Sequence, residues 1–530
     1  MTTPGSRPGP PGHADLHGLK STWSQALQMP FATLPLRLEG EIADLIVYGK
    51  IPKEIDGTFY RIMVDPMFPQ LPEAIIPIEG DGNISAFRIH NGQVDMKIKY
   101  VDTERLKLER KANKRLFGLY RNPFTHHPCV RAAVDSTANT NLVMWAGHLL
   151  ALKKVALPYA VDPDTLETLA YDPFAGQVQA KTFTAHPKVD PYTEELVVFG
   201  YEARGLTSLD IVIYALDKTG VKRDEQWIKS PWCGMIHDCA ITENFIILVI
   251  WPFESDMDRL KAGKQHWAWA PNRPATFIVA PRRPGKNLPA GWQTGDYRVY
   301  EWKNCICLHT AGAWEGKDGK LYMESSRIFD NELLFFPPAD GNAPPPVGNA
   351  DFVRWEFDLS KPSGSKIPDP QVVLDLPSEF PRMDERFMSK EYEWLFLDVV
   401  LGGQVAPSVV ASLNGLAMVN TKTGKTQYYN AGENCNTQEP IFIPRSSSAP
   451  EGDGWVLAMV ERKAANLSHL VLLDTRNFEE PLAIIQLPLQ LKSQIHGNWV
   501  EYSPVGERKS LVRQTGSVQV SGRGALEAEY

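Results

Sequence analysis

The sequence predicts an all-β fold of the closed propeller type, and three observations support this prediction. Short apolar strands recur along the chain between Asx-type turns, and few segments show a helical pattern. No change of composition divides the chain into separate domains. Four histidines (His186, His237, His309 and His496) each stand where a strand starts or a turn begins, although they are spread over most of the sequence. Imidazoles so far apart can converge on one metal only if the fold returns its strands repeatedly to one axis, as a propeller does.

The composition is that of an ordinary globular protein, with 530 residues, 43% hydrophobic and 22% charged. The 55 basic and 63 acidic residues give a net charge of -8, and the basic residues are scattered, so nucleic acid is not expected as a partner. No apolar run approaches the roughly 20 residues that cross a bilayer, which leaves peripheral membrane contact open.

The six cysteines form no C-x-x-C pair, and no secretory signal precedes them. We therefore expect reduced thiols and a cytoplasmic location. We interpret Cys305-Ile306-Cys307 as part of one strand with alternating side chains rather than as a metal or redox site.

The ends of the chain are expected to be tails. Residues 1–35 are predicted to be disordered or loosely packed, because their first part is rich in Pro, Gly and Ser and lacks the apolar stretch of a targeting peptide. Residues 36–511 are predicted to form a single propeller domain with a cap of loops, and 512–530 a C-terminal tail.

Local turn chemistry predicts individual hairpins. The alternating run Ser85–Ile89 leads into Asn91-Gly92, the dipeptide typical of a two-residue hairpin turn. The Gly316–Lys320 segment predicts another hairpin directly after His309. Strand ends followed by Asx-type turns occur at 161–166, 216–220, 419–424 and 473–477. The apolar strand runs beside them are 196–201, 211–214, 245–250 and 470–473.

Two longer insertions interrupt the strands. Residues 256–274 contain several aromatic side chains, and 335–346 are rich in proline. Loops of this length are usually functional or disordered, and their aromatic content favours a cap or tunnel wall. A membrane-facing or partner-facing patch is the alternative.

Taken together, these features resemble the carotenoid cleavage oxygenase family from about Leu36 to about Leu511. Besides the four histidine contexts, the matching segments are Gly57–Arg61, Glu79–Gly82, Thr137–Asn141, Pro377–Arg382 and Gln438–Phe442. The resemblance implies a seven-bladed β-propeller with capping loops and short helices over an iron-containing face. It also implies one non-haem Fe(II) per chain, held by neutral imidazoles, with O2 as co-substrate.

The resemblance further implies carboxylates behind the histidines, because a ligating imidazole needs an acceptor on its other nitrogen. Glu379 and Glu439 match two such glutamates of the family. At the third position this chain has Lys154, and a cation cannot accept a hydrogen bond. We therefore expect His186 to be oriented instead by a water, a backbone carbonyl or a carboxylate from elsewhere in the chain.

The neighbouring Lys153 points to the branch of the family that cleaves stilbenes. Members of that branch carry a lysine there, paired with a tyrosine that corresponds to Tyr120 in Tyr120-Arg121-Asn122-Pro123. Successive strand residues face opposite sides, so one of the two adjacent lysines is expected to point inward and the other toward solvent. Two lysines on a solvated strand are the alternative.

This branch implies cleavage of the interphenyl C=C bond of a phenolic 4-hydroxystilbene, of the resveratrol or lignostilbene type, to two aromatic aldehydes. The Lys153 ammonium and the Tyr120 phenol would stabilise the substrate phenolate and so enrich the vinyl bridge in electrons. Thr140 is expected to crowd the iron and limit access of small ligands. Phe59 and Phe329 are expected as walls for ring stacking, with simple core positions as the alternative.

Three further histidines are not expected to bind metal: His126 and His127 lie in a turn-like stretch before a proline, and His148 follows Gly147 in a hairpin turn. Three other functions stay open. Cleavage of a carotenoid or apocarotenoid at the same iron would require a long apolar tunnel. A propeller that only binds a partner would need no metal, and a metal-dependent lactonase would need harder, carboxylate ligands.

Overall fold

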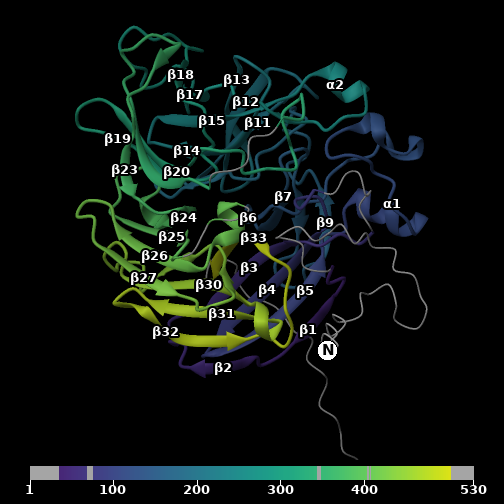
Figure 1. Cartoon of the computed structure of the whole chain (residues 1–530), viewed down its shortest axis with the longest axis vertical. Helices are drawn as coiled ribbons and strands as arrows, with labels where there is room; N and C mark the ends of the chain where they lie inside the picture. Colours follow the sequence, from purple (N-terminus) through teal and green to yellow (C-terminus); the bar gives the residue numbers. More distant parts are fainter. Residues whose placement is uncertain (1–34, 69–75, 343–347, 403–404, 406–407, 503–530) are drawn as a thin grey trace, which may run out of the picture.

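The computed structural model describes residues 35–68, 76–342, 348–402, 405 and 408–502, and it shows a seven-bladed β-propeller (Figure 1). The two predicted tails lie outside the described residues, apart from Pro35. The prediction of an all-β propeller is therefore confirmed.

The first four blades follow the chain in order, each with its innermost strand named first. Blade one contains β33 (Gln494–Glu501), β3 (Gly57–Val64), β4 (Gly82–His90), β5 (Gln93–Tyr100) and β1 (Gly40–Ile42). Blade two contains β6 (Asn141–Trp145), β7 (His148–Leu152), β8 (Tyr159–Val161) and β9 (Thr168–Tyr171). Blade three contains β10 (Lys188–Asp190), β11 (Glu195–Tyr201), β12 (Asp210–Asp217) and β13 (Lys222–Lys229). Blade four contains β14 (Gly234–Ile241), β15 (Phe245–Glu254), β17 (Ala275–Pro281), β18 (Arg298–Trp302) and β22 (Ser365–Lys366), with β16 (Ala268–Trp269) paired to β15.

The last three blades complete the ring. Blade five contains β19 (Thr310–Glu315), β20 (Leu321–Ile328), β21 (Ala350–Phe357) and β23 (Gln371–Leu374). Blade six contains β24 (Ser378–Met383), β25 (Trp394–Val399), β26 (Gly415–Asn420) and β27 (Thr426–Asn430). Blade seven contains β28 (Cys435–Thr437) and β29 (Ile441–Pro444), which both pair with β30 (Gly454–Arg462), followed by β31 (Leu467–Asp474), β32 (Asn477–Gln486) and β2 (Ile46–Gly49).

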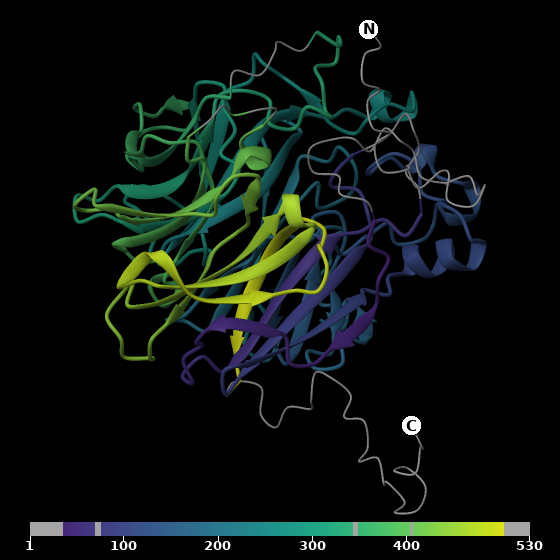
Figure 2. The same ribbon diagram turned by 60° about the horizontal axis from the view of Figure 1, so that its bottom comes forward.

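Strands from the two ends of the described chain close the ring at two places. The C-terminal strand β33 pairs antiparallel with β3, with Trp499 opposite Phe59. The N-terminal strand β2 pairs antiparallel with β32, and Figure 2 shows this purple strand beside the yellow strands of blade seven. Strands far apart in sequence thus share two blades, which leaves no open seam between the ends of the propeller.

The core lies between the faces of neighbouring blades, so most inner strands are buried on both sides. Every residue of β3 is buried, as are the residues of β15 from Phe245 to Phe253. A fully buried Val, Leu, Ile or Phe contributes roughly 1.5–3 kcal/mol of transfer free energy. This packing explains why the strands appear in the sequence as continuous apolar runs rather than as alternating patterns.

The local hairpin predictions are confirmed. His90 pairs with Gln93 across Asn91 and Gly92, whose φ angles of 51° and 81° are those of a two-residue turn with both residues left-handed. His148 starts β7 after an analogous turn. The interpretation of Cys305–Cys307 as part of a strand is wrong, because Ile306 forms an isolated bridge with Ile328 and the two buried cysteines flank it outside any strand.

In the described part of the chain, three short α-helices lie in the connections: α1 (Glu104–Ala112), α2 (Met257–Lys261) and α3 (Val409–Ser412). The hydroxyl of Thr103 caps α1 by accepting a hydrogen bond from the Leu106 amide. The insertion at 256–274 folds into α2 and β16, and its Trp267 and Trp269 are buried. Among the described residues, no helix is long and apolar enough to span a membrane.

Candidate active site

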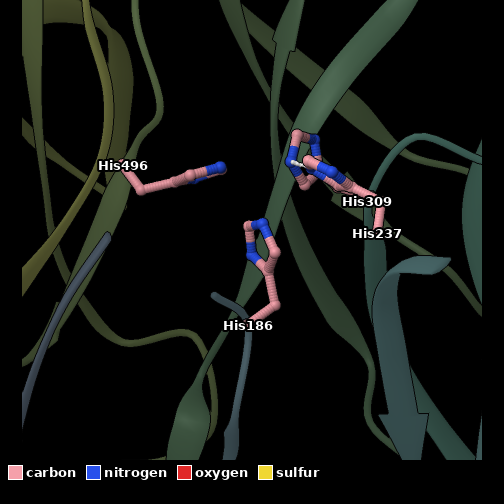
Figure 3. Close-up of side chains that lie close together, drawn as sticks. All are labelled: His186, His237, His309 and His496. Carbon is pink, nitrogen blue, oxygen red and sulfur yellow. Dashed lines mark hydrogen bonds between the residues drawn. The ribbon is translucent and has the colours of Figure 1, made fainter. Parts of the chain in front are cut away.

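The four histidines come together at the propeller axis, each from the inner side of a different blade. His186 lies two residues before β10, His237 lies in β14, His309 immediately precedes β19 and His496 lies in β33. One ring nitrogen of each lies within 4.8 Å of the others, and the four side chains point toward one another in Figure 3. Residues separated by up to 310 positions thus form one cluster because neighbouring inner strands contact each other around the axis.

The geometry of this cluster fits a single metal ion. The Nε2 atoms of His237 and His309 are 2.9 Å apart, and the Nε2 atoms of His186 and His496 are buried without a hydrogen-bond partner among the described residues. Nitrogens bound about 2.1 Å from one metal lie about 3 to 4.2 Å from each other. Burial lowers the pKa of His186, His237 and His496, which favours the neutral imidazole that binds metal.

Two of the four imidazoles are oriented by buried carboxylates. Nδ1 of His309 lies 2.5 Å from Oε2 of Glu379, and Nδ1 of His496 lies 3.1 Å from Oε1 of Glu439. Glu439 also accepts a hydrogen bond from Arg382, and although burial raises the pKa of Glu439, His496 and Arg382 hold it below its usual value. Each carboxylate accepts the Nδ1 proton and so leaves Nε2 free to face the common centre.

Among the described residues His186 has no glutamate partner, as expected, but Lys154 lies behind His237 and not behind His186, so the link between Lys154 and His186 needs correction. The Lys154 Nζ atom contacts Nδ1 of His237, and His186 makes no side-chain hydrogen bond within the described part of the chain. Burial, with Lys153 and Arg121 nearby, lowers the pKa of Lys154 well below that of a free lysine. A neutral amine has a lone pair, so Lys154 can accept the Nδ1 proton, which a charged lysine could not do.

Aromatic side chains, which the sequence did not single out, pack against the imidazoles. The ring of Trp251 stacks on His237 with centroids 4.6 Å apart, and its Nε1 atom donates a hydrogen bond to the Cys307 carbonyl. The ring of Phe380 stacks on His309 at 5.1 Å. Trp251 directly follows the apolar run 245–250. Nothing in that pattern predicts that the ring of Trp251 lies beside His237 of β14.

A cavity of about 190 Å³ reaches His237 and His309, and Tyr120, Lys153 and Thr140 line it. The Lys153 Nζ atom lies 5.3 Å from the centroid of the Tyr120 ring. It donates hydrogen bonds to Asn139 Oδ1 at 2.9 Å and to the Ile78 carbonyl at 3.3 Å. The structure therefore places the lysine and the tyrosine side by side in a cavity that ends at the histidines.

Both adjacent lysines point into the protein, so the expectation that they face opposite sides is wrong. Lys153 is 4% exposed and Lys154 is 8% exposed, and both line this cavity. Strand β7 ends at Leu152, so the lysines lie in the turn beyond it, where the alternation of a strand no longer applies.

Burial also determines the charge state of the two polar groups at this wall. It lowers the pKa of Lys153 to about 8, against the raising effect of Glu79 and with the help of Arg105. It raises the pKa of Tyr120 well above its usual value, so this side chain remains a neutral phenol. The wall thus offers one proton donor that stays protonated and one that exchanges its proton near physiological pH.

Thr140 lines the same cavity, and its hydroxyl lies 3.2 Å from Asn139 Oδ1. The expectation that Phe59 and Phe329 form cavity walls is not met. Phe59 is fully buried in the core between blades one and seven, and Phe329 packs against Arg327; neither lines either cavity that reaches the histidines. The loop residues Leu333 and Phe335 supply apolar wall instead.

A second, more polar cavity of about 170 Å³ reaches His186, His309 and His496. His126 and His127 lie outside the histidine cluster, as expected, and His126 instead binds Asp135 at 3.0 Å.

Comparison with known proteins shows that similar sequences cover nearly the whole chain. The family model described as retinal pigment epithelial membrane protein (RPE65) matches residues 33–501. The resveratrol cleavage oxygenase 1 of Botryotinia fuckeliana is 62% identical over 528 residues, which cover 99% of this chain and 95% of that protein. The carotenoid cleavage oxygenase 1 of Neurospora crassa is 40% identical over 489 residues, which cover 89% of this chain and 90% of that protein.

A solved structure gives the same result for the fold. The crystal structure of a lignostilbene dioxygenase from Pseudomonas brassicacearum matches with a TM-score of 0.83 and 36% identity, covering 90% of this chain and 98% of the other. The extent of these matches confirms the resemblance that the histidine contexts suggested. The chain belongs to the family of RPE65 and the carotenoid cleavage oxygenases.

Proposed function

We propose that this protein is an Fe(II) dioxygenase that cleaves the interphenyl C=C bond of 4-hydroxystilbenes. One stilbene and one O2 give two aromatic aldehydes, so that each vinyl carbon receives one oxygen atom. The observation that carries this proposal is the position of Lys153 beside Tyr120 in a cavity that reaches the histidines. The names of the similar fungal and bacterial proteins, which refer to resveratrol and lignostilbene, support the same substrate class.

His186, His237, His309 and His496 would hold the iron. Glu379 and Glu439 act as positioning residues, because they fix the tautomers of His309 and His496. Fe(II) bound there would supply the binding and activation of O2, chemistry that amino-acid side chains do not perform.

Lys153 and Tyr120 would bind the 4-hydroxyl group of the substrate. Two hydrogen-bond acceptors, Asn139 Oδ1 and the Ile78 carbonyl, hold the Lys153 Nζ atom and leave one of its three protons for a ligand. An ammonium and a phenol on the same oxygen stabilise a phenolate through charge-assisted hydrogen bonds. The phenolate donates electron density through the ring to the vinyl bridge, which makes that bridge reactive toward activated O2.

Thr140 would narrow the space beside the iron, since it lines the cavity near Asn139. All six cysteines are free thiols, which supports the expectation of a reducing, cytoplasmic compartment.

Carotenoid cleavage fits this cavity less well. A polyene has no polar group that could pair with Lys153 or with the Tyr120 hydroxyl, and each buried polar group left unpaired costs about 1–3 kcal/mol. The phenolic end of a stilbene satisfies both groups at once.

The deciding experiment loads the purified protein with Fe(II) under anaerobic conditions and then admits air. A 4-hydroxystilbene, its 4-methoxy ether and an apocarotenal are supplied in parallel, and products are identified by mass spectrometry. We expect two aldehydes from the hydroxystilbene alone. Cleavage of the apocarotenal alone would contradict the proposal, and so would equal cleavage of the methoxy ether, which cannot form a phenolate.

Two variants locate the substrate contact. Lys153→Met should retain iron and lose most of the activity, and Tyr120→Phe should lose part of it, because the phenyl ring stays and one hydrogen bond is removed. Exposed Lys53 provides the control, since Lys53→Met should behave as the unchanged protein. Unchanged turnover in Lys153→Met would contradict the phenolate model.

A further inference from the structure

The cavity that reaches His237 and His309 has a second polar wall, built from a different part of the propeller. Lys153 and Tyr120 belong to blade two and the segment before it. The second wall comes from blade seven and the segment that leads into β33, and it contains Gln438, Glu461 and Ser493. An elongated substrate with polar groups on both rings would find polar partners at both walls.

Glu461 is the acidic group of this second wall. It lies in β30 and is 4% exposed. Gln438 Nε2 donates a hydrogen bond to its Oε1 atom at 2.8 Å, and Ser493 Oγ donates to the same atom at 2.5 Å. Gln438 is itself held, since its Oε1 atom accepts a hydrogen bond from Arg61 at 3.3 Å. The carboxylate is therefore fixed in place at the cavity wall.

The two donors leave one carboxylate oxygen without a partner. Both hydrogen bonds go to Oε1, and no donor from the described residues reaches Oε2. Oε2 is not among the fully buried atoms that lack a partner, and Glu461 lines the cavity, so this oxygen is accessible to a ligand that supplies a donor. A role limited to holding Ser493 and Gln438 would be served as well by a neutral amide.

We propose that Glu461 Oε2 accepts a hydrogen bond from a hydroxyl group on the second ring of the substrate. This inference rests on the proposed stilbene-cleaving function of the same cavity. It narrows the substrate class to stilbenes that carry a 4-hydroxyl on one ring and a further hydroxyl on the other, as in the 3,5,4′-trihydroxy compound resveratrol. Glu461 then selects the substrate and takes no part in bond cleavage.

The chemistry of phenols suits this position. A phenol hydroxyl is a good donor, and a carboxylate is a charged acceptor, so their hydrogen bond is of the stronger, charge-assisted kind. A methyl ether or an unsubstituted ring offers no donor to Oε2. Sites that lose a hydrogen-bond partner in this way discriminate against the deficient substrate more strongly than apolar pockets do.

The test compares kcat/KM for resveratrol with that for 4-hydroxystilbene, which lacks the hydroxyls of the second ring, using the full-length protein loaded with Fe(II). In the unchanged protein we expect resveratrol to be favoured by at least about tenfold. Equal values for the two substrates would overturn the inference. Failure to cleave either substrate would instead contradict the proposed function itself.

Variants then assign the preference to Glu461. Glu461→Leu should abolish the preference by raising KM for resveratrol more than KM for 4-hydroxystilbene. Glu461→Gln should keep part of the preference, because its amide oxygen still accepts a hydrogen bond. Exposed Glu433 on the neighbouring loop provides the matched control, and Glu433→Leu should leave both substrates unaffected.

A structural role would give a different result. If Glu461→Leu lowered the cleavage of both substrates by the same factor, Glu461 would merely hold the wall in shape, and the inference would be wrong. If Glu461→Leu does not fold, Glu461→Gln decides the question, because it keeps the size of the side chain and should still lose part of the preference.

Discussion

Lys153 and Lys154 are neighbours in the sequence, yet their surroundings give them different chemistry. Both are buried, but Lys153 faces Asn139 and the ring of Tyr120, whereas Lys154 faces the ring of His237. One of them can therefore act on a substrate and the other on a metal ligand.

The pKa of Lys153 predicts how kcat/KM for the cleavage of 4-hydroxystilbene depends on pH. The reactive pair of ammonium and phenolate contains one proton fewer than a charged lysine with a neutral phenol. Burial places the pKa of Lys153 at about 8, and a free phenol has a pKa of about 10. Below pH 8 a proton must be lost, so kcat/KM should rise about tenfold per pH unit, level off above pH 8 and fall above about pH 10.

Steady-state kinetics from pH 6 to above pH 10 would measure this profile. In Lys153→Met the remaining proton to be lost is that of the substrate phenol, so the rise should continue to about pH 10 instead of levelling off near pH 8. A plateau that still begins near pH 8 in this variant would show that a different group titrates.

The contact between Lys154 and His237 leads us to expect that a carboxylate in place of Lys154 would raise the affinity for metal. Lys154→Glu would place an anionic acceptor on Nδ1 of His237, as Glu379 and Glu439 do for two other histidines. Such groups typically change metal affinity by about 10- to 100-fold. We therefore expect Lys154→Glu to bind Fe(II) or Co(II) at least about tenfold more tightly in anaerobic titrations.

Lys154→Met serves as the matched control, since it removes the amine without adding a carboxylate. Equal affinities of Lys154→Glu and the unchanged protein would mean that His237 gains nothing from an anionic partner.

For single strands and turns, the sequence predicts those features of local structure that are determined by residues adjacent in the chain. The Asn91-Gly92 turn has its own conformational preference, so the hairpin of β4 and β5 could be recognised locally. The end of β7 at Leu152 could not, because the orientation of Lys153 and Lys154 depends on contacts with Asn139 and His237, which lie elsewhere in the sequence.

The same reasoning explains which site residues were recognised and which were missed. Residues in family motifs, such as Glu379 and Glu439, could be assigned by resemblance. Glu461 and Trp251 lie in ordinary strand patterns, and their places at the cavity and beside His237 follow from the packing of blades. Phe59 occupies the core, the alternative left open for it, because an aromatic residue in a strand is equally suited to core and cavity.

Strands β33 and β3 are packed so closely along their seam that we expect one added methyl group to lower the stability of the protein. A Cβ atom added at Gly497 would lie 2.4 Å from the Tyr60 carbonyl oxygen and 2.6 Å from Cγ of Arg61. Because backbone is less able to move than a side chain, Gly497→Ala should destabilise the protein by about 1–3 kcal/mol. It should also weaken metal binding, since His496 is the adjacent residue.

Thermal unfolding and a Co(II) titration would measure the two effects. Gly40 provides the control, because a Cβ atom there meets nothing within 4 Å. If Gly497→Ala and Gly40→Ala unfolded at the same temperature, the seam would be more adaptable than its geometry indicates.

At the scale of the whole molecule, the histidines connect parts of the chain that the fold joins only through blade packing. His186, His237, His309 and His496 belong to blades three, four, five and one, and blade one is itself closed by the two ends of the described chain. An ion bound by all four would therefore tie the ring together at its axis.

Metal binding is accordingly expected to stabilise the entire propeller. A ligand that binds the folded state alone stabilises it by about 2.7 kcal/mol at a concentration of 100 times its Kd. The thermal unfolding midpoint of the metal-free protein should rise by a few degrees on addition of Co(II), measured at a fixed scan rate. His309→Ala should lose this shift together with iron binding and activity, because one of the four ligands is removed. His127→Ala, which alters an exposed histidine outside the cluster, should keep it. A full shift in His309→Ala would mean that Co(II) stabilises the protein at another site, and the ligand assignment would then be wrong.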